Sequence, residues 1–268
     1  MLKKFFLGSS LLLAAGCTTV PITGRRQLSL VPDSEMNSLA ITQYKQTLAE
    51  SKLSTNAEQT AMVRRVGTRI ANAVEQYFKQ QGQSDQLSGY NWEFNLIDDP
   101  KTVNAWCMPG GKVVVYTGIL PLTQDENGLA VVLGHEISHA VAKHGTERMS
   151  DQMVAQLGTS VVSTALSQNP TATNNIFRQA VGAGVGVGSQ LGLLAFSRRQ
   201  ESEADHLGLI FMAMAGYNPE GAVAFWQRMA AQSQNSTPAF LSDHPADAQR
   251  IADIKADMPE ALKYYKPR

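Results

Sequence analysis

One stretch of the sequence, LAVVLGHEISHAVAKHG at residues 129–145, constrains the fold more than any other. Residues four apart on an α-helix share a face, so a helix here places the imidazoles of His135 and His139 together, with Glu136 beside them. Two neutral imidazoles leave a bound zinc ion its charge and an open coordination position, where a neighbouring carboxylate can deprotonate a water molecule. The spacing therefore indicates the HExxH zinc-binding helix. The alternative is a surface helix whose two histidines bind nothing.

A second helical pattern, RRQESEADHLG, offers the third ligand. Glu201 and Asp205 are four residues apart and share a helix face, whereas Glu203 falls on the other side. Glu201 would complete a zinc-binding set with His135 and His139. Asp205 would accept the other ring proton of a ligand histidine and so fix its tautomer. Alone, the pattern also fits a solvated acidic helix start, but downstream of HExxH it favours a metal site completed by a water molecule.

The ends of the HExxH helix are also marked in the sequence. Thr123 and Glu126 have the three-residue offset of a capping box, and Gly145 stands where a C-terminal cap is expected. His144 is nine positions from His135, about 180° round a continuous helix. It is therefore predicted to face solvent or the helix end rather than the metal.

Upstream, the hydrophobic periodicity predicts two helices, at about 34–50 and 56–81. The period changes to two at residues 92–96, which predicts a strand. Residues 104–117 predict a β-hairpin whose turn contains Pro109, Gly110 and Gly111. The expected fold class is α+β, mostly helical, with a small β-sheet or hairpin beside the HExxH helix.

The first 16 residues resemble a bacterial lipoprotein signal peptide. Lys3 and Lys4 form a basic start, residues 5–15 are apolar but too short to span a bilayer, and small residues lead to Cys17. By this resemblance the mature chain begins at Cys17, which carries the lipid. A plain secretory signal with cleavage nearby is the alternative.

The lipid would anchor an otherwise soluble protein. Thr18, rather than aspartate, follows the cysteine, which favours the periplasmic face of the outer membrane over retention at the inner one. Residues 17–33 are polar and contain two prolines, which predicts a tether, although their apolar members also fit a segment lying along the domain. Residues 34–268 are enough for one catalytic domain with one core.

The charge and cysteine content of the chain argue against a nucleic-acid-binding protein and against an internal disulfide. Lys and Arg equal Asp and Glu, 23 against 23, so the chain has no basic field for nucleic acid. If Cys17 is lipidated, Cys107 is the only other cysteine, and one thiol forms no internal disulfide. We therefore predict no nucleic-acid partner and no internal disulfide.

A glycine-rich apolar segment precedes the second acidic motif. The 17 residues 180–196 carry no charge, which fits a membrane segment, but they are few and rich in glycine. A mobile lid over the cleft, at residues 181–196, is the favoured interpretation.

Four motifs in order now carry a family resemblance. HEISH and RRQESEAD, preceded by NAWCMPGGKVVVYTGIL and followed by DHPADAQRI, resemble the gluzincin family of HtpX-like and CAAX-prenyl-endopeptidase zinc metallopeptidases. The opening TGRRQLSLV is similar to the bacterial lipoprotein branch, and the likeness runs over about residues 23–250. It implies a zincin-type fold, Glu136 as general base, and one zinc per chain on His135, His139 and Glu201. It also implies that a substrate peptide adds to the hairpin's edge strand.

The DHPADAQRI motif contributes two further candidates, His244 and Arg250. A peptidase needs a cationic or hydrogen-bonding group for the oxyanion, and either residue suits that role. Spacing alone favours a turn-capping histidine and an arginine in a surface ion pair, and the resemblance reverses this in favour of the cleft. His244 could also occupy the open zinc position in a latent form.

The predicted function is a lipid-anchored zinc endopeptidase that cuts misfolded or unassembled envelope proteins, with Glu136 activating the water. The alternative, from another class, is a lipid-anchored chaperone or assembly factor with little proteolysis. An intact Glu136 favours the peptidase, because zinc binding alone does not require a base.

Overall fold

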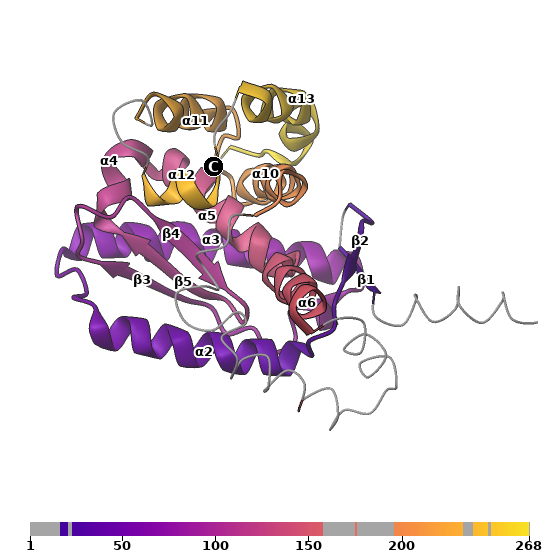
Figure 1. The fold of residues 1–268 in the computed structure, drawn as a ribbon. Coiled ribbons are helices and arrows are strands. Elements are labelled where there is room, and N and C mark those ends of the chain that lie inside the picture. The colour runs from indigo at the N-terminus through magenta and orange to yellow at the C-terminus, as the bar shows by residue number, and fades with distance from the viewer. Residues whose placement is uncertain are drawn as a thin grey trace, which may run out of the picture.

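Helix α5 (Glu126–Val141), which carries both histidines of HExxH, lies at the centre of the structure. The computed structural model describes residues 17–20, 23–157, 175, 196–232, 238–245 and 248–267. All residues of α5 from Gly128 to Val141 are buried, and α10 (Arg198–Met214) packs along it (Figure 1). The interpretation of a surface helix is therefore wrong.

Two glycines bring α5 and α10 unusually close. A Cβ atom added to Gly134 would lie 2.9 Å from the backbone oxygen of Gly208, and one added to Gly208 would lie 2.9 Å from the Gly134 carbonyl carbon. Only residues without side chains permit this approach. As a result His135, next to Gly134, faces the acidic first half of α10 across a short distance.

A three-stranded sheet lies beside α5. Its order is β3 (Glu93–Ile97), β5 (Lys112–Tyr116), β4 (Ala105–Met108), with β3 parallel and β4 antiparallel to β5. The β4–β5 hairpin turns through Gly110 and Gly111, whose φ angles of 81° and 79° favour glycine. The predicted strand and hairpin are confirmed, and β4 is an edge strand of this sheet.

Alternate residues of the strands face opposite layers. Val113 and Val115 join the main core with α3 (Ala57–Gln80) and α5, whereas Val114 packs with Tyr44 of α2 (Asp33–Glu50) on the other face. Figure 1 shows α2 along one side of the sheet and α3 and α5 along the other. The two predicted upstream helices are thus confirmed as α2 and α3.

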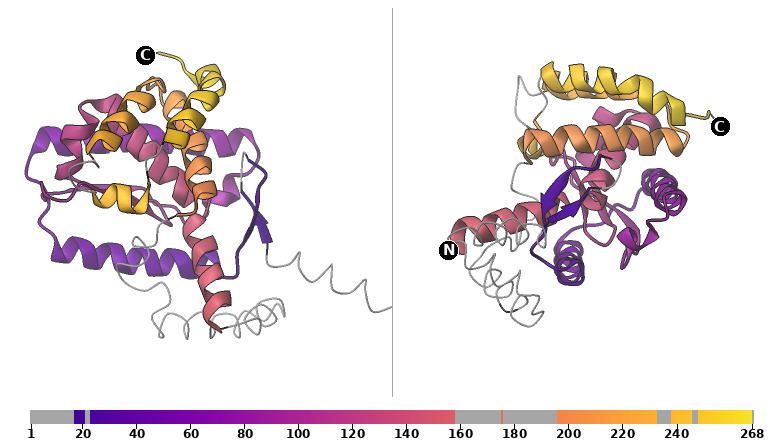
Figure 2. Two further views of the ribbon diagram at one scale, coloured as in Figure 1. Left: turned by 45° about the horizontal axis from the view of Figure 1, so that its top comes forward. Right: turned by 90° about the vertical axis from the view of Figure 1, so that its right-hand side faces the viewer.

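The remaining elements surround this centre (Figure 2). Helices α11 (Gly221–Gln232) and α13 (Ala248–Tyr264) cover α5 and α10. The other surrounding elements are the 3-10 helices η1 (Ser84–Leu87) and η2 (Thr117–Ile119), and the helices α4 (Leu120–Thr123), α6 (His144–Leu157) and α12 (Ala239–Asp243). The fold is mostly helical with small sheets, as the sequence predicts.

The N-terminal region lies along the domain rather than forming a free tether. Strands β1 (Cys17–Thr19) and β2 (Arg26–Leu28) pair antiparallel, with Cys17 opposite Leu28. Val20 is fully buried in the main core, and Gln27 donates a 2.8 Å hydrogen bond to the Ala142 carbonyl. We refer to residues 17–20 and 23–28 as the N-terminal hairpin.

Both predicted ends of the HExxH helix are wrong. Thr123 ends α4, Gln124 adopts a φ of 66°, and Asp125 caps α5 by accepting from the Gly128 amide at 2.8 Å. At the other end Lys143 has a φ of 59°, which stops the helix before Gly145 is reached. The chain then restarts as α6 in a new direction.

Two predictions lie outside the described residues. These are the signal peptide at residues 1–16 and the lid at residues 181–196, of which only Phe196 is described. Within the described part of the chain, no helix combines the length and apolar character needed to cross a membrane.

Candidate metal centre

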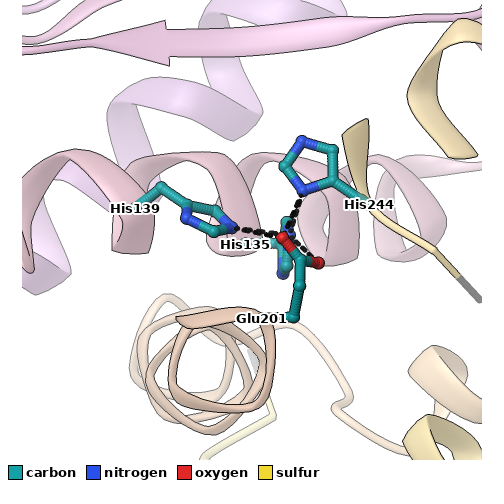
Figure 3. Close-up of side chains that lie close together, drawn as sticks. All are labelled: His135, His139, Glu201 and His244. Atoms are coloured by element: carbon teal, nitrogen blue, oxygen red, sulfur yellow. Dashed lines mark hydrogen bonds and ion pairs between the residues drawn. The ribbon is translucent and has the colours of Figure 1, made fainter. Parts of the chain in front are cut away.

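Four buried side chains from three parts of the chain converge beside α5. His135 and His139 come from α5, Glu201 from the first turn of α10, and His244 from the residue after α12 (Figure 3). Each offers one ligand atom, and these atoms lie within 4.8 Å of one another. The structure therefore brings together the predicted ligands and one of the two residues predicted for the oxyanion.

The donor chemistry of this group fits one zinc ion. His135 Nε2 lies 3.0 Å from His139 Nε2, and each is 3.4 Å from an oxygen of Glu201. Both Nδ1 atoms face other partners, so the two Nε2 atoms present lone pairs to a common point. Two neutral imidazoles and one carboxylate are the ligands of a catalytic zinc site with an open position.

The Glu201 carboxylate is suited to a cation. Burial alone would raise the pKa of Glu201, but His244 and His135 hold it well below its usual value. Arg250 Nη1 lies 2.8 Å from Glu201 Oε2 and adds to this field. Glu201 is therefore ionised wherever the domain is folded near neutral pH.

Asp205 lies where the i, i+4 spacing predicts. His135 Nδ1 is 2.9 Å from Asp205 Oδ1, so the imidazole donates there and keeps its Nε2 lone pair for a metal. Burial opposes ionisation of Asp205, but Arg250 and His135 lower its pKa below the usual value.

Arg250 is buried, but it supports the ligands rather than facing the cleft. Its guanidinium donates to both oxygens of Asp205, at 2.6 and 2.8 Å, and lies 3.5 Å from the ring centroid of Trp226. The described residues that line the cleft include Arg148 and not Arg250. The oxyanion role predicted for Arg250 therefore lacks geometric support, because Asp205 and Glu201 hold its guanidinium behind the ligands.

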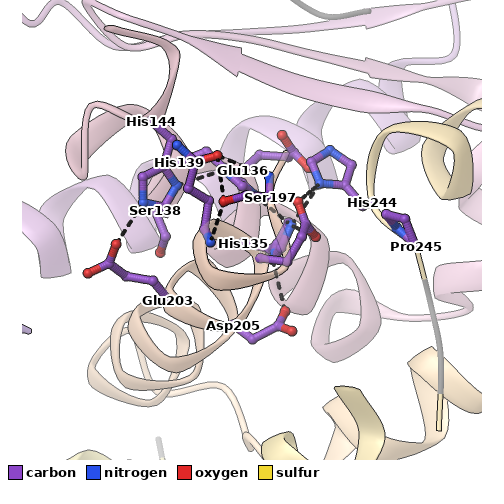
Figure 4. A network of polar contacts seen from close by, with 12 residues as sticks. His135, Glu136, Ser138, His139, His144, Ser197, Glu203, Asp205, His244 and Pro245 are labelled. Carbon is purple, nitrogen blue, oxygen red and sulfur yellow. Dashed lines mark hydrogen bonds and ion pairs between the residues drawn. The ribbon is translucent and has the colours of Figure 1, made fainter. Parts of the chain in front are cut away.

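His244 lies between the ligands and the base. Its Nδ1 is 2.9 Å from Glu201 Oε1 and 3.1 Å from His135 Nε2, while its Nε2 is 3.3 Å from Glu136 Oε1 (Figure 4). The side chain is 4% exposed, which excludes a histidine that merely caps a surface turn. A latent arrangement with His244 at the open zinc position requires this location and stays a prediction.

Glu136 is buried beside the ligand set without being part of it. Its Oε1 accepts no hydrogen bond from the residues that the structure describes. Burial raises the pKa of Glu136, which His244 and His135 partly counteract. A carboxylate with a raised pKa and an acceptor atom that makes no hydrogen bond to the described residues, although His244 Nε2 lies 3.3 Å away, is suited to take a proton from water.

A cleft of about 510 Å³ opens onto these residues. Strand β4 and its flanks, residues 104–109, line one side, and α2 lines the other with polar side chains such as Gln43 and Thr47. Glu136 and His244 lie within it. The edge strand predicted to receive a peptide thus borders the candidate metal centre.

Phe196 stands over the ligands from the cleft side. Its ring centroid is 3.8 Å from that of His139 and 5.3 Å from that of His244. The Arg148 guanidinium lies 3.6 Å from the Phe196 centroid on this side of the site. Neither residue was singled out by the sequence patterns.

His144 is the main site residue that sequence reasoning misplaced. It is fully buried, with Nδ1 2.9 Å from His139 Nδ1 and Nε2 3.0 Å from Glu203 Oε2. The prediction of a side chain at solvent or at the helix end assumed one continuous helix; His144 lies just past the end of α5, but it is buried rather than exposed to solvent. The left-handed φ of Lys143 breaks that helix and turns His144 back toward His139.

Comparison with known proteins agrees with this geometry. The chain matches peptidase family M48 over residues 58–258. It is 35% identical over 247 residues to the mitochondrial metalloendopeptidase OMA1 of Schizosaccharomyces pombe, covering 90% of this chain and 66% of that relative. It is 28% identical over 248 residues to metalloendopeptidase OMA1 of Homo sapiens, covering 91% and 46%.

A bacterial relative is also similar. The chain is 28% identical over 173 residues to the beta-barrel assembly-enhancing protease of Escherichia coli, covering 61% of this chain and 34% of the relative. The chain thus spans at most 66% of the length of these three relatives. Since the family match covers most of the chain and its donor set fits one zinc ion, the chain belongs to peptidase family M48, a family of zinc metallopeptidases.

Proposed function

We propose that this chain is a lipid-anchored zinc endopeptidase of the bacterial lipoprotein branch of its family. It would act at the periplasmic face of the outer membrane on misfolded or unassembled envelope proteins. The observation that carries the peptidase proposal is Glu136, a buried base beside the set formed by His135, His139 and Glu201. Similarity to a beta-barrel assembly-enhancing protease supports an envelope role.

The chemistry follows from the positions of these groups. A zinc ion held by His135, His139 and Glu201 would supply the Lewis acid that polarises the scissile carbonyl and the attacking water. Glu136 takes the proton from that water and passes it to the leaving amine. Its Oε1 is buried beside His244 Nε2 and accepts no hydrogen bond from the described residues.

The substrate class follows from the edge strand. A peptide paired with β4 would be held by main-chain hydrogen bonds, with its side chains alternating between the cleft and solvent. Main-chain recognition requires an extended segment, which a folded domain rarely offers. Unfolded or unassembled chains therefore fit the cleft better than native surfaces.

Purified protein should cleave an unfolded casein substrate, and a chelator should stop the cleavage. Adding zinc back should restore it, which separates metal loss from unfolding. Cleavage that is indifferent to chelation would contradict the zinc peptidase. Tight binding of unfolded protein without cleavage would instead support the chaperone alternative.

The anchor proposal predicts a change in location. Cys17→Ser should shift the protein from the outer-membrane fraction to the soluble periplasm, or leave it unprocessed, because a serine cannot carry the thioether lipid. Cys107→Ser is the matched control and should leave fractionation unchanged. Identical fractionation of wild type and Cys17→Ser would point to another anchor.

We further propose that the arrangement of His244 is a latent state. Its Nδ1 stands at the fourth ligand position and its Nε2 faces Glu136, so one side chain covers both the open position and the base. His244→Ala should therefore raise basal cleavage of a short peptide several-fold. His206→Ala, a partly exposed histidine on α10, serves as control.

The opposite result has a definite meaning. If His244 instead meets the oxyanion, His244→Ala should lower kcat by about 100- to 1000-fold. A loss of that size would replace the latent role with the oxyanion role predicted from the sequence.

A further inference from the structure

The two α5 histidines have different outer hydrogen bonds. His135 Nδ1 faces the Asp205 carboxylate at 2.9 Å, the arrangement expected of a zinc-binding histidine. His139 Nδ1 faces a second imidazole, that of His144, at 2.9 Å. No role in the peptidase chemistry accounts for a fully buried third histidine at this point.

The direction of the protons follows from the ligand atoms. His139 directs Nε2 to the metal centre, so as a neutral ligand it carries its proton on Nδ1 and donates to His144 Nδ1. His144 then carries its proton on Nε2 and donates to Glu203 Oε2 at 3.0 Å. The Glu203 carboxylate is therefore linked to the zinc ligand His139 through two hydrogen bonds.

Glu203 is itself held by the N-terminal hairpin. Arg25 Nε donates to Glu203 Oε2 at 2.6 Å, and the Thr23 hydroxyl donates to Oε1. Arg25 also forms two bonds to Glu147 of α6, at 2.7 and 2.8 Å. Figure 4 shows Glu203 and His144 on the side of the site opposite His244.

The same break in the helix makes this chain of contacts possible. Lys143 ends α5 with a φ of 59°, and the Gln27 amide of the hairpin donates to the Ala142 carbonyl at that corner. The hairpin therefore contacts both the corner that turns His144 inward and the Glu203 carboxylate that accepts the hydrogen bond of His144.

We propose that Glu203, held by Thr23 and Arg25 of the N-terminal hairpin, fixes His144, and that His144 positions His139 for the metal. Apart from His139, these are positioning residues, since none of them is among the described residues that line the cleft. The inference rests on the proposed zinc site and extends it to a segment more than one hundred residues away in sequence.

Loss of an outer partner typically lowers metal affinity by about 10- to 100-fold. We expect a loss in this range for Glu203→Ala and His144→Ala. Glu203→Gln keeps an acceptor oxygen for His144 and should recover part of the affinity. Arg25→Ala leaves Glu203 its bonds to Thr23 and His144, so its effect should be smaller.

The test is the zinc dissociation constant of the full chain, measured by competition with a chromophoric chelator. Two control variants match the location without touching the hydrogen-bonded chain. Arg26→Ala removes the exposed neighbour of Arg25. Ser150→Ala removes the hydroxyl that accepts from the Leu30 amide at 2.9 Å, and so loosens packing near the hairpin. Both controls should retain wild-type affinity.

A second readout reports the proton directly. In heteronuclear NMR of the zinc-loaded chain, the His139 Nδ1 proton should be visible and slow to exchange. This proton should exchange rapidly with water in His144→Ala. Thermal unfolding of the metal-free protein shows separately whether the substitution has changed the stability of the fold. A purely structural role for His144 would alter stability and leave the proton signal of the folded fraction intact.

Three outcomes would overturn the proposal. Unchanged zinc affinity in Glu203→Ala and His144→Ala would exclude it, as would an equal loss in Ser150→Ala. A wild-type chain that binds no zinc would remove the metal site and this inference together. Normal zinc binding without peptidase activity would contradict the proposed function and leave the positioning role to be decided by the affinities.

Discussion

Glu136→Gln is expected to abolish peptide cleavage while the protein keeps its full zinc content. The amide has the size of the carboxylate but cannot take a proton from water. General base catalysis contributes about 100- to 10,000-fold, and we expect kcat/KM to fall by that amount. The measurements are kcat/KM on an internally quenched peptide and metal content by mass spectrometry.

The structure explains why zinc should remain. Glu136 is absent from the group of four convergent ligand atoms, and its Oε1 accepts no hydrogen bond from the described residues. Removing its charge therefore breaks no ligand bond. Loss of zinc together with activity would instead show that Glu136 is a ligand.

Glu126→Gln is the matched control on the same helix. Glu126 lies in the first turn of α5 and pairs with Arg65 at the surface, away from the cleft. Surface ion pairs contribute about 0–1 kcal/mol, so this variant should retain both activity and zinc. Equal losses in the two variants would mean that the helix, rather than the base, had been damaged.

The ligands on α5 and α10 were predictable because their geometry is local. Four-residue spacing on a helix brings His135 to His139, and Glu201 to Asp205, whatever the rest of the chain does. How close the two helices lie depends on Gly134 and Gly208, which sequence reasoning did not single out. The sequence therefore predicts each pair of side chains, but it does not predict how closely the two helices approach each other.

His144 and Arg250 show what spacing cannot predict. The position of His144 depends on one backbone angle, that of Lys143, and no glycine marks this left-handed residue. Arg250 was expected in the cleft because the family resemblance favours that position for a group that meets the oxyanion. Which buried arginine faces the cleft depends on the packing of α13 against α10, a contact between segments distant in sequence.

The N-terminal hairpin illustrates the same limit. The polar composition and two prolines of residues 17–33 predict a tether, but the side chain of Arg25 contacts two carboxylates, Glu147 and Glu203, from different helices. Those helices are adjacent only in the folded domain. The composition of a segment does not show which residues from other parts of the chain contact it in the folded domain.

Glu201→Ala is expected to lose most of its zinc and, with it, all cleavage. It removes the only anionic ligand of the proposed set and leaves two neutral imidazoles from one helix, a much weaker site. The fold should survive, because Arg250, the buried cation paired with Glu201, keeps both bonds to Asp205.

Zinc content after dialysis against a weak chelator tests this directly, with Glu260→Ala on the exposed side of α13 as control. The zinc content of Asp205→Ala should lie between those of Glu201→Ala and Glu260→Ala, because this change removes the hydrogen bond to His135 Nδ1 without removing a ligand. The loss of zinc should be largest without the ligand Glu201, smaller without Asp205, and absent without the surface carboxylate Glu260. This order is specific to a metal held by Glu201. Full zinc in Glu201→Ala would exclude Glu201 as a required ligand and would leave His244 as the third ligand of the site.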